Sequence, residues 1–244
     1  MLNTAYVSWK DPGSHAWYVV GRLTEKQDGY EFAYTKGAIK AKNFVPFPGF
    51  DDLYRKYFST TLFPLFSNRL IRDTRPEYSA FIEWLELPKE TSSPVDILSR
   101  SGGRRATDSL QIFKRLLPEK DGKLAAYFFA HGLSHLTDKA DERVSKLFQG
   151  EKLEIVHEKD NPKDPYAALV TATNPKQRVG YLPRYMSREL LLLQEKSPES
   201  FTVQVQAIRP DIPYHYRLLC KIQGLVSPEL FNEFNQNKEF EDIC

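Results

Sequence analysis

The second half of the chain contains short runs rich in β-branched and aromatic residues, and these runs constrain the fold more than any other feature. They are predicted strands at residues 125–130, 152–157, 167–173, 178–182, 201–208 and 216–223. Between them, residues 138–148 and 187–194 have the apolar spacing of helices. Many short strands with two helices in about 100 residues are typical of a small β-barrel and not of a doubly wound sheet.

The first half begins with a predicted β-meander. Three strand-like runs, Tyr6–Trp9, Ala16–Leu23 and Tyr30–Thr35, are separated by short segments that contain Pro, Gly and Asp. Further along, residues 51–57 and 76–87 carry apolar residues at three- and four-residue spacing, which predicts two helices. The second helix is expected to begin after Thr74, because Pro76 is tolerated in a first turn.

A length of 244 residues allows two small domains. Pro, Gly and charged residues cluster at 117–122, which predicts a boundary between a first domain at 1–118 and a second at 123–224. Residues 225–244 form the expected tail, with a short helix capped by Ser227. The predicted fold class is α+β: an N-terminal β-meander with helices, then a small OB-like β-barrel with two helices, then a short C-terminal helix.

Charge and cysteine content exclude several classes of protein. The formal net charge is only +2, so the chain does not coat nucleic acid by bulk attraction, and any such contact needs a local patch. Cys220 and Cys244 are too few for a disulfide scaffold or a four-cysteine zinc site. No signal-peptide pattern opens the sequence and no apolar run approaches the ~20 residues of a membrane span, so we expect a cytoplasmic protein without membrane contact.

Motifs of catalysis are missing from the sequence. It lacks a Gly-x4-Gly-Lys-Ser/Thr phosphate loop, a Gly-x-Ser-x-Gly elbow and the paired motifs of kinases. His131 and His135 have the spacing of two metal ligands on a helix, but Gly132 and the surrounding strand pattern disfavour a helix there. We therefore expect packed or hydrogen-bonded histidines, and a chain with no catalytic residue, metal or cofactor.

The most specific segment runs from residue 153 to 184. A predicted strand ends near Asp160, and Asn161 with Pro162 forces a turn in which Asp164 can cap or clamp the loop. A second strand resumes at Ala167. The later Val-Gly-Tyr-Leu-Pro-Arg run, 179–184, places Tyr181 beside a glycine that permits close backbone approach.

This arrangement resembles the HIRAN domain, which occurs on fork-remodelling helicases and in many bacterial proteins. The residues that match the family pattern in order are Asn161, Pro162, Asp164, Ala167, Val179, Gly180, Tyr181, Pro183 and Arg184. The resemblance covers about residues 123–224. It implies an OB-like barrel that binds single-stranded DNA, with a free 3′ end recognised in the helicase members.

The resemblance also implies roles for residues of this chain. The implied DNA-binding set is His135, Asn161, Lys163, Asp164, Tyr181 and Arg184. In it, Asp164 accepts a hydrogen bond from the 3′ hydroxyl, Tyr181 lies near the terminal base or sugar, and Arg184 neutralises phosphate. The helicase members carry an arginine and an aromatic residue where this chain has Ser134 and His135, and an aromatic residue at Lys163. An alternative is therefore a protein–protein adaptor or antitoxin whose barrel has lost DNA-end binding, with Asn161 and Asp164 only holding the turn.

The first half resembles a second family, the HipA-type toxin kinases, in their small N-terminal subdomain. The matching residues are Gly21, Leu23, Phe32, Tyr34, Phe63, Pro64 and Arg69, within about residues 3–117. This resemblance implies a toxin–antitoxin context, with a HipA-type kinase and a helix-turn-helix repressor as partners. Separately, Arg100, Arg104 and Arg105 flank a Gly-Gly pair and form either a patch for phosphate or an acidic partner, or a solvated loop.

Overall fold

The computed structural model describes residues 3–162 and 164–244, and it divides the chain into two compact units. Unit 1 comprises Met1–Arg115 with Asn237–Cys244, and unit 2 comprises Leu116–Gln236. The expected tail, 225–244, is therefore not one piece. Its helix belongs to unit 2, whereas its last residues complete unit 1.

Unit 1 is built on a five-stranded antiparallel sheet with the order β4-β3-β2-β1-β5. Its strands are β1 (Asn3–Lys10), β2 (Trp17–Lys26), β3 (Gly29–Tyr34), β4 (Tyr57–Ser59) and β5 (Leu110–Phe113). Its helices are α1 (Lys36–Lys40), α2 (Pro64–Ser67), α3 (Tyr78–Trp84) and α4 (Pro94–Ser101), and the short 3-10 helix η4 (Lys238–Phe240) follows near the C-terminus. The predicted meander is confirmed, since β1, β2 and β3 are sequential antiparallel neighbours.

The predicted helix at 51–57 is wrong. The side chain of Asp52 accepts a hydrogen bond from the backbone N–H of Tyr54 (2.8 Å), and the hydroxyl of Tyr57 bonds the backbone of Asp52. These local bonds stabilise a turn that leads into β4, because short polar side chains compete with helical backbone bonding. The helix expected at 76–87 is the shorter α3, and its N-cap position is Glu77 and not Thr74.

The C-terminal residues pack onto the sheet of unit 1. Asp242 pairs with Thr35 in a β-bridge, and its carboxylate lies 2.5 Å from a guanidinium nitrogen of Arg22. Phe240 is buried, with its ring edge-on to that of Tyr6 at 4.9 Å. The last eight residues therefore contribute to the core of unit 1, although they are distant from it in sequence.

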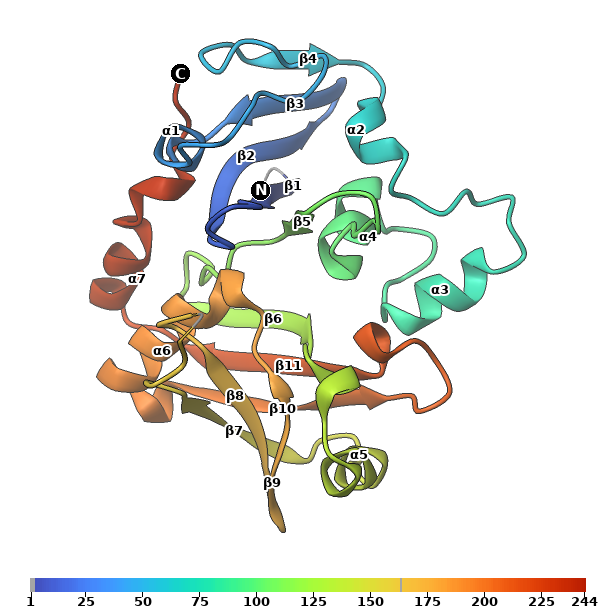
Figure 1. The fold of residues 1–244 in the computed structure, drawn as a ribbon, viewed down its shortest axis with the longest axis vertical. Helices are drawn as coiled ribbons and strands as arrows, with labels where there is room; N and C mark the ends of the chain where they lie inside the picture. Colours follow the sequence, from blue (N-terminus) through green and yellow to red (C-terminus); the bar gives the residue numbers. More distant parts are fainter. Residues whose placement is uncertain (1–2, 163) are drawn as a thin grey trace. The chain divides into compact units, whose positions relative to one another are not determined.

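Unit 2 contains a six-stranded antiparallel sheet with the order β6-β11-β10-β7-β8-β9 (Figure 1). The strands are β6 (Lys123–Phe129), β7 (Lys152–His157), β8 (Ala168–Thr173), β9 (Lys176–Tyr181), β10 (Phe201–Ile208) and β11 (Leu218–Leu225). The helices are α5 (Asp138–Ser145), α6 (Arg184–Lys196) and α7 (Pro228–Asn235), with 3-10 turns η1 (Leu133–His135), η2 (Pro198–Ser200) and η3 (Tyr214–Tyr216). The predicted terminal helix is confirmed, and the Ser227 side chain caps it by accepting a bond from the N–H of Leu230.

One β-bridge joins the two ends of this sheet. His131, which follows β6, and Tyr181, the last residue of β9, exchange two backbone hydrogen bonds of 2.9 Å each. Because β6 and β9 are the outer strands of the sheet, this bridge closes it into a barrel and removes the edge there. The expected small barrel is confirmed. Within the residues that the structure describes, no helix has the length and apolar character needed to cross a membrane.

Candidate nucleic-acid interface

The loop between β7 and β8 is held in shape by its own polar side chains. The backbone N–H of Glu158 bonds the carbonyl of Ala167 at 2.8 Å and closes the base of the loop. Inside it, Oδ1 of Asn161 accepts from the N–H of Asp164 (3.1 Å), and Oδ1 of Asp164 accepts from the N–H of Tyr166 (3.0 Å). Asn and Asp are favoured in loops because their side chains can accept hydrogen bonds from backbone N–H groups two or three residues further on. The sequence-based expectation that Asp164 clamps the loop is confirmed.

Asp164 also fixes the first residue of α6. Its Oδ2 lies 3.2 Å from Nε of Arg184, and the two side chains are 17% and 34% exposed. A cation at a helix N-terminus is unfavourable on its own, because the helix dipole is positive there. The carboxylate offsets that cost and ties the loop to the helix. Both side chains remain accessible to solvent at this junction.

Tyr181 joins the other side of the same loop. Its hydroxyl donates to Oε2 of Glu158 at 3.2 Å, and Nδ2 of Asn161 donates to the same oxygen at 2.5 Å. Arg178 reaches the Tyr181 hydroxyl with Nη1 at 3.5 Å, and its Cζ lies 5.6 Å from the centre of the ring. Glu158 thus links the tyrosine to the asparagine. We call Glu158, Asn161, Asp164, Tyr181 and Arg184 the loop cluster.

The bridge that closes the barrel also positions Tyr181. Gly132, next to the bridging His131, adopts the left-handed conformation (φ +75°), and a Cβ placed on it would lie 3.2 Å from Cδ2 of Tyr181. The ring therefore packs directly against this glycine. His135 follows in η1 and is exposed, on the turn that begins beside the Tyr181 ring.

The structure brings together four of the six residues of the predicted DNA-binding set. Asn161, Asp164, Tyr181 and Arg184 belong to one hydrogen-bonded network, whereas no contact joins His135 to it among the described residues. Lys163 lies outside the residues that the structure describes.

The sequence reasoning missed Glu158 and Arg178. Simple alternation along β9 places Arg178 and Tyr181 on opposite faces, because they are three residues apart. A bulge at this point, where Thr171 pairs with Arg178 and Val170 with Gly180, brings both side chains to one side. Glu158 lies three residues before Asn161, and a turn brings positions with this spacing together. That spacing could have predicted the contact between the two side chains.

The charges of this region balance. Two carboxylates and two guanidinium groups take part: Tyr181 links Arg178 to Glu158, and Arg184 contacts Asp164. Carboxylates accept hydrogen bonds from hydroxyl groups and repel phosphates, whereas guanidinium groups bind phosphates. Such a cluster can accept a hydrogen bond from a hydroxyl group at its carboxylates and bind a phosphate at its guanidinium groups.

The three arginines of the Gly-Gly segment differ in their environment. Arg100 is half-buried, and its Nη1 donates to the carbonyl of Leu85 at 2.9 Å, which ties α4 to the end of α3. Gly102 ends α4 in the left-handed conformation, and both glycines are buried. Gly102 is thus the C-cap of α4, and Arg104 and Arg105, which follow the pair, are exposed.

The histidines after β6 differ in their environment. His131 is half-buried in the closing bridge and His135 is exposed in η1, so they do not share a helix face. Among the described residues, no three His, Cys, Asp or Glu side chains gather where they could hold a metal ion.

Comparisons with known proteins identify unit 2. Residues 123–226 match the family model of the HIRAN domain. Among solved structures, the chain is similar to the crystal structure of the HIRAN domain of human HLTF, with 14% sequence identity and a TM-score of 0.37, over 51% of this chain and 98% of that one. No curated protein matches the sequence. The chain carries a HIRAN domain at residues 123–226, which confirms the resemblance read from the motifs.

The same comparisons do not support the second resemblance. The family match covers residues 123–226 and does not extend to residues 3–117, where a HipA-type subdomain was expected. The toxin–antitoxin context and the partners inferred from that resemblance, a HipA-type kinase and a helix-turn-helix repressor, are likewise unsupported.

Proposed function

We propose that the HIRAN domain of this chain binds single-stranded DNA at a 3′ end, and that the loop cluster is the pocket for that end. The observation that carries the proposal is the pair of carboxylates flanked by guanidinium groups beside a half-buried tyrosine. The family resemblance supplies the ligand class, and the chemistry of the cluster is consistent with it.

Each member of the loop cluster has a distinct role in this proposal. Asp164 accepts the 3′ hydroxyl, because each of its oxygens makes one bond to the residues that the structure describes and keeps a further lone pair. Arg184 contacts the last phosphate, and Tyr181 packs against the terminal sugar or base, a contact worth about 1–3 kcal/mol. Glu158 and Asn161 hold Tyr181 and the loop in place.

The pocket should distinguish two kinds of DNA end. A 3′ phosphate would bring two negative charges against Asp164 and Glu158, and like charges placed together cost several kcal/mol. A free hydroxyl avoids that cost and gains a charge-assisted hydrogen bond. We expect a shallow salt dependence, because few phosphates are neutralised.

Fluorescence anisotropy with a short oligothymidine tests the proposal, with one version ending in a 3′ hydroxyl and one in a 3′ phosphate. We expect the hydroxyl version to bind at least tenfold more tightly, about 1.4 kcal/mol. Asp164→Ala and Arg184→Ala should each weaken binding by at least that factor. Lys146→Ala is the matched control, since it removes an exposed cation of the same unit at the C-cap of α5. Equal binding of both ends, or equal loss in the control, would refute the proposal.

We further propose that the chain acts by binding and not by catalysis. The sequence carries no recognised catalytic motif. In the proposal, every residue of the loop cluster either contacts the DNA end or holds the pocket in shape. Cleavage of a labelled strand incubated with the full chain and Mg²⁺, lost in a single-residue variant, would contradict this part of the proposal.

A further inference from the structure

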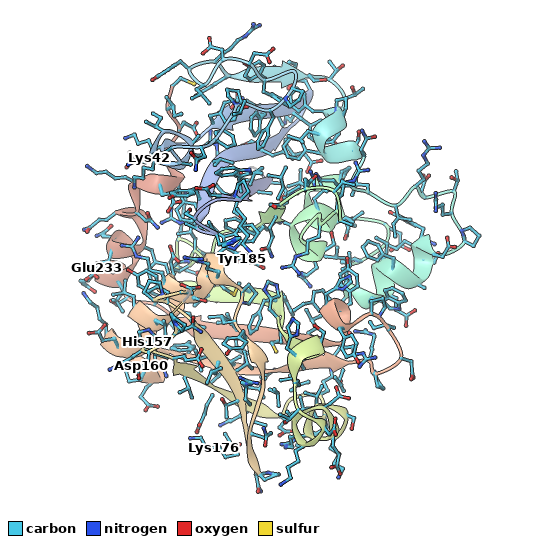
Figure 2. The ribbon with its side chains drawn as sticks, viewed as in Figure 1. Lys42, His157, Asp160, Lys176, Tyr185 and Glu233 are labelled. Atoms are coloured by element: carbon cyan, nitrogen blue, oxygen red, sulfur yellow. The ribbon has the colours of Figure 1, made fainter. Side chains whose placement is uncertain are left out.

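A groove of about 1230 Å³ lies in unit 2 between the second half of β7 and α6. It lies beside the loop cluster, because Lys159 and Tyr166 of the same loop line it, while residues 161 and 164 do not. In Figure 2, His157 at the end of β7 lies close to Asp160 at the start of that loop. None of the five residues of the loop cluster lines the groove.

One wall of the groove is an open strand edge. β7 pairs with β8 as far as His157, but its pairing with β10 on the other side ends at Leu153. Among the described residues, no strand lies beside that edge from Glu154 to His157. One side-chain bond occupies part of it, since Nε2 of Gln194 donates to the carbonyl of Ile155 at 2.8 Å. An unpaired edge of this kind is a template for another strand.

The floor and the opposite wall are apolar. Val156 and Tyr166 are 37% and 44% exposed, which is high for large apolar side chains. Leu191 and Leu192 of α6 are half-buried and line the groove across from the strand. A strand edge that faces a helix across an apolar groove is an arrangement that binds extended peptides by strand addition.

The two ends of the groove carry opposite charges. α6 runs opposite to β7, because its first residue contacts Asp164 in the loop after β7 while Gln194 contacts Ile155 within the strand. Lys159 and Arg188 therefore lie toward the end of β7, and Glu195 lies next to Gln194, toward its start. Glu154 lies at that start too, with its carboxylate 3.4 Å from Nζ of Lys176. Glu199 of η2 also lines the groove.

We propose that this groove binds an extended peptide, which adds to β7 as an antiparallel strand. The peptide has acidic residues at its N-terminal end, to meet Lys159 and Arg188, and basic residues at its C-terminal end, to meet Glu154 and Glu195. Small aliphatic residues lie between them, over Val156. The antiparallel direction follows the other pairings of the barrel and is the more stable one.

A peptide fits this groove better than DNA does. The carboxylates of Glu195 and Glu199 would repel the phosphates of a strand that followed the groove. The open edge offers backbone hydrogen bonds, which a peptide can satisfy along its length and a nucleotide chain cannot. The proposal therefore stands apart from DNA-end binding, and either can fail without the other.

Fluorescence anisotropy on the full chain tests the peptide proposal. The probe is labelled Asp-Asp-Val-Thr-Val-Lys-Lys, capped at both ends, and the comparison peptide has its Asp and Lys residues exchanged. We expect the probe to bind at least fivefold more tightly than the exchanged peptide. N-methylation of the alternate residues whose N–H groups face β7 should abolish binding, and methylation of the other set should leave it unchanged.

Variants of the chain localise the binding. Val156→Asp should weaken the probe at least tenfold, whereas Leu225→Asp, which changes another exposed apolar residue of the barrel (63% exposed), should have no effect. Arg188→Glu should weaken the probe and strengthen binding of the exchanged peptide. Equal binding of the two peptides, or no loss with Val156→Asp, would overturn the proposal. Loss of oligothymidine binding with Val156→Asp, to the same extent as peptide binding, would assign the groove to nucleic acid instead.

Discussion

Gly132 lies next to the bridge that closes the barrel. Its replacement by alanine has two effects on stability: a backbone cost of the left-handed conformation, and a steric contact with the Tyr181 ring. The residue has φ +75°, so alanine there adopts a left-handed conformation at a cost of about 1–2 kcal/mol. Gly150 has φ +85° in the same unit, but nothing lies within 4 Å of the position of its added Cβ. Gly150→Ala is therefore a matched control for the backbone cost alone.

The additional effect at Gly132 comes from the Tyr181 ring. The added Cβ lies 3.2 Å from Cδ2 of the ring, shorter than the usual 3.5–4.0 Å contact, so the ring must move by a few tenths of an ångström. That movement lengthens the bond from the Tyr181 hydroxyl to Glu158, now 3.2 Å. A hydrogen bond to a charged group contributes about 1.5–3 kcal/mol, and partial loss of it gives roughly 1 kcal/mol beyond the control.

Hydrogen exchange measured by mass spectrometry on the full chain checks this reasoning. The amides of His131 and Tyr181 form the closing bridge, and they should exchange about fivefold faster in Gly132→Ala than in Gly150→Ala. Binding of the 3′-hydroxyl oligothymidine should fall in the first variant only. Equal exchange in the two variants would show that the ring contact does not hold the bridge, and the account of Tyr181 positioning would then be wrong.

Two further predictions concern stability. Ser93 and Asp96 cap α4 reciprocally. Partial burial opposes ionisation of the Asp96 carboxyl, but hydrogen bonds from Lys114 and Ser93 outweigh that effect and hold the pKa of Asp96 below its usual 3.8. The carboxylate therefore stabilises unit 1 above pH ~3.8, and this contribution is lost as the pH falls through the folded-state pKa. Asp96→Ala should lower the free energy of unfolding by about 1 kcal/mol at pH 7 and by less in acid. Urea titrations followed by tryptophan fluorescence measure both values. Arg143 and Glu151 form a buried ion pair in unit 2. Arg143→Ala should lower the free energy of unfolding by about 3–5 kcal/mol, measured by thermal unfolding, because it leaves the Glu151 carboxylate buried without its partner, and the double variant Arg143→Met with Glu151→Leu should recover the loss. A loss under about 1 kcal/mol in Arg143→Ala would refute this prediction.

The strands of unit 2 could be predicted from the sequence because local signals agree there. Short β-branched runs bounded by turns place β7, β8 and β10 within a residue or two of their observed limits. The segment from residue 36 to 70 could not be predicted in the same way. There the hydroxyl of Tyr34 accepts from the N–H of Phe47 (2.7 Å) and donates to the carbonyl of Phe50 (2.9 Å), so distant contacts decide the path of the chain.

The site was predictable in part for the same reason. Asn161, Asp164 and Arg184 lie in motifs that are close in sequence, and the structure joins them as the motifs suggested. Glu158 and Arg178 enter the site through the closure of the barrel and the bulge in β9, and neither leaves a periodic signal. Contacts between side chains of two different strands depend on how the strands pair, so they can be identified only once the fold is known.

The two proposed ligands meet along α6, and this arrangement predicts that each weakens the other. Arg184 and Arg188 are four residues apart on the helix, about 6 Å along its axis, which is less than the Debye length of about 8 Å at physiological salt. A phosphate held at Arg184 lowers the positive potential that attracts the acidic end of the peptide at Arg188. We therefore expect saturating 3′-hydroxyl oligothymidine to weaken the Asp-Asp-Val-Thr-Val-Lys-Lys probe several-fold, with the reciprocal effect on DNA. The coupling should disappear near 1 M salt, where the Debye length is about 3 Å, and coupling that persisted there would point to a conformational link through the shared loop instead of charge.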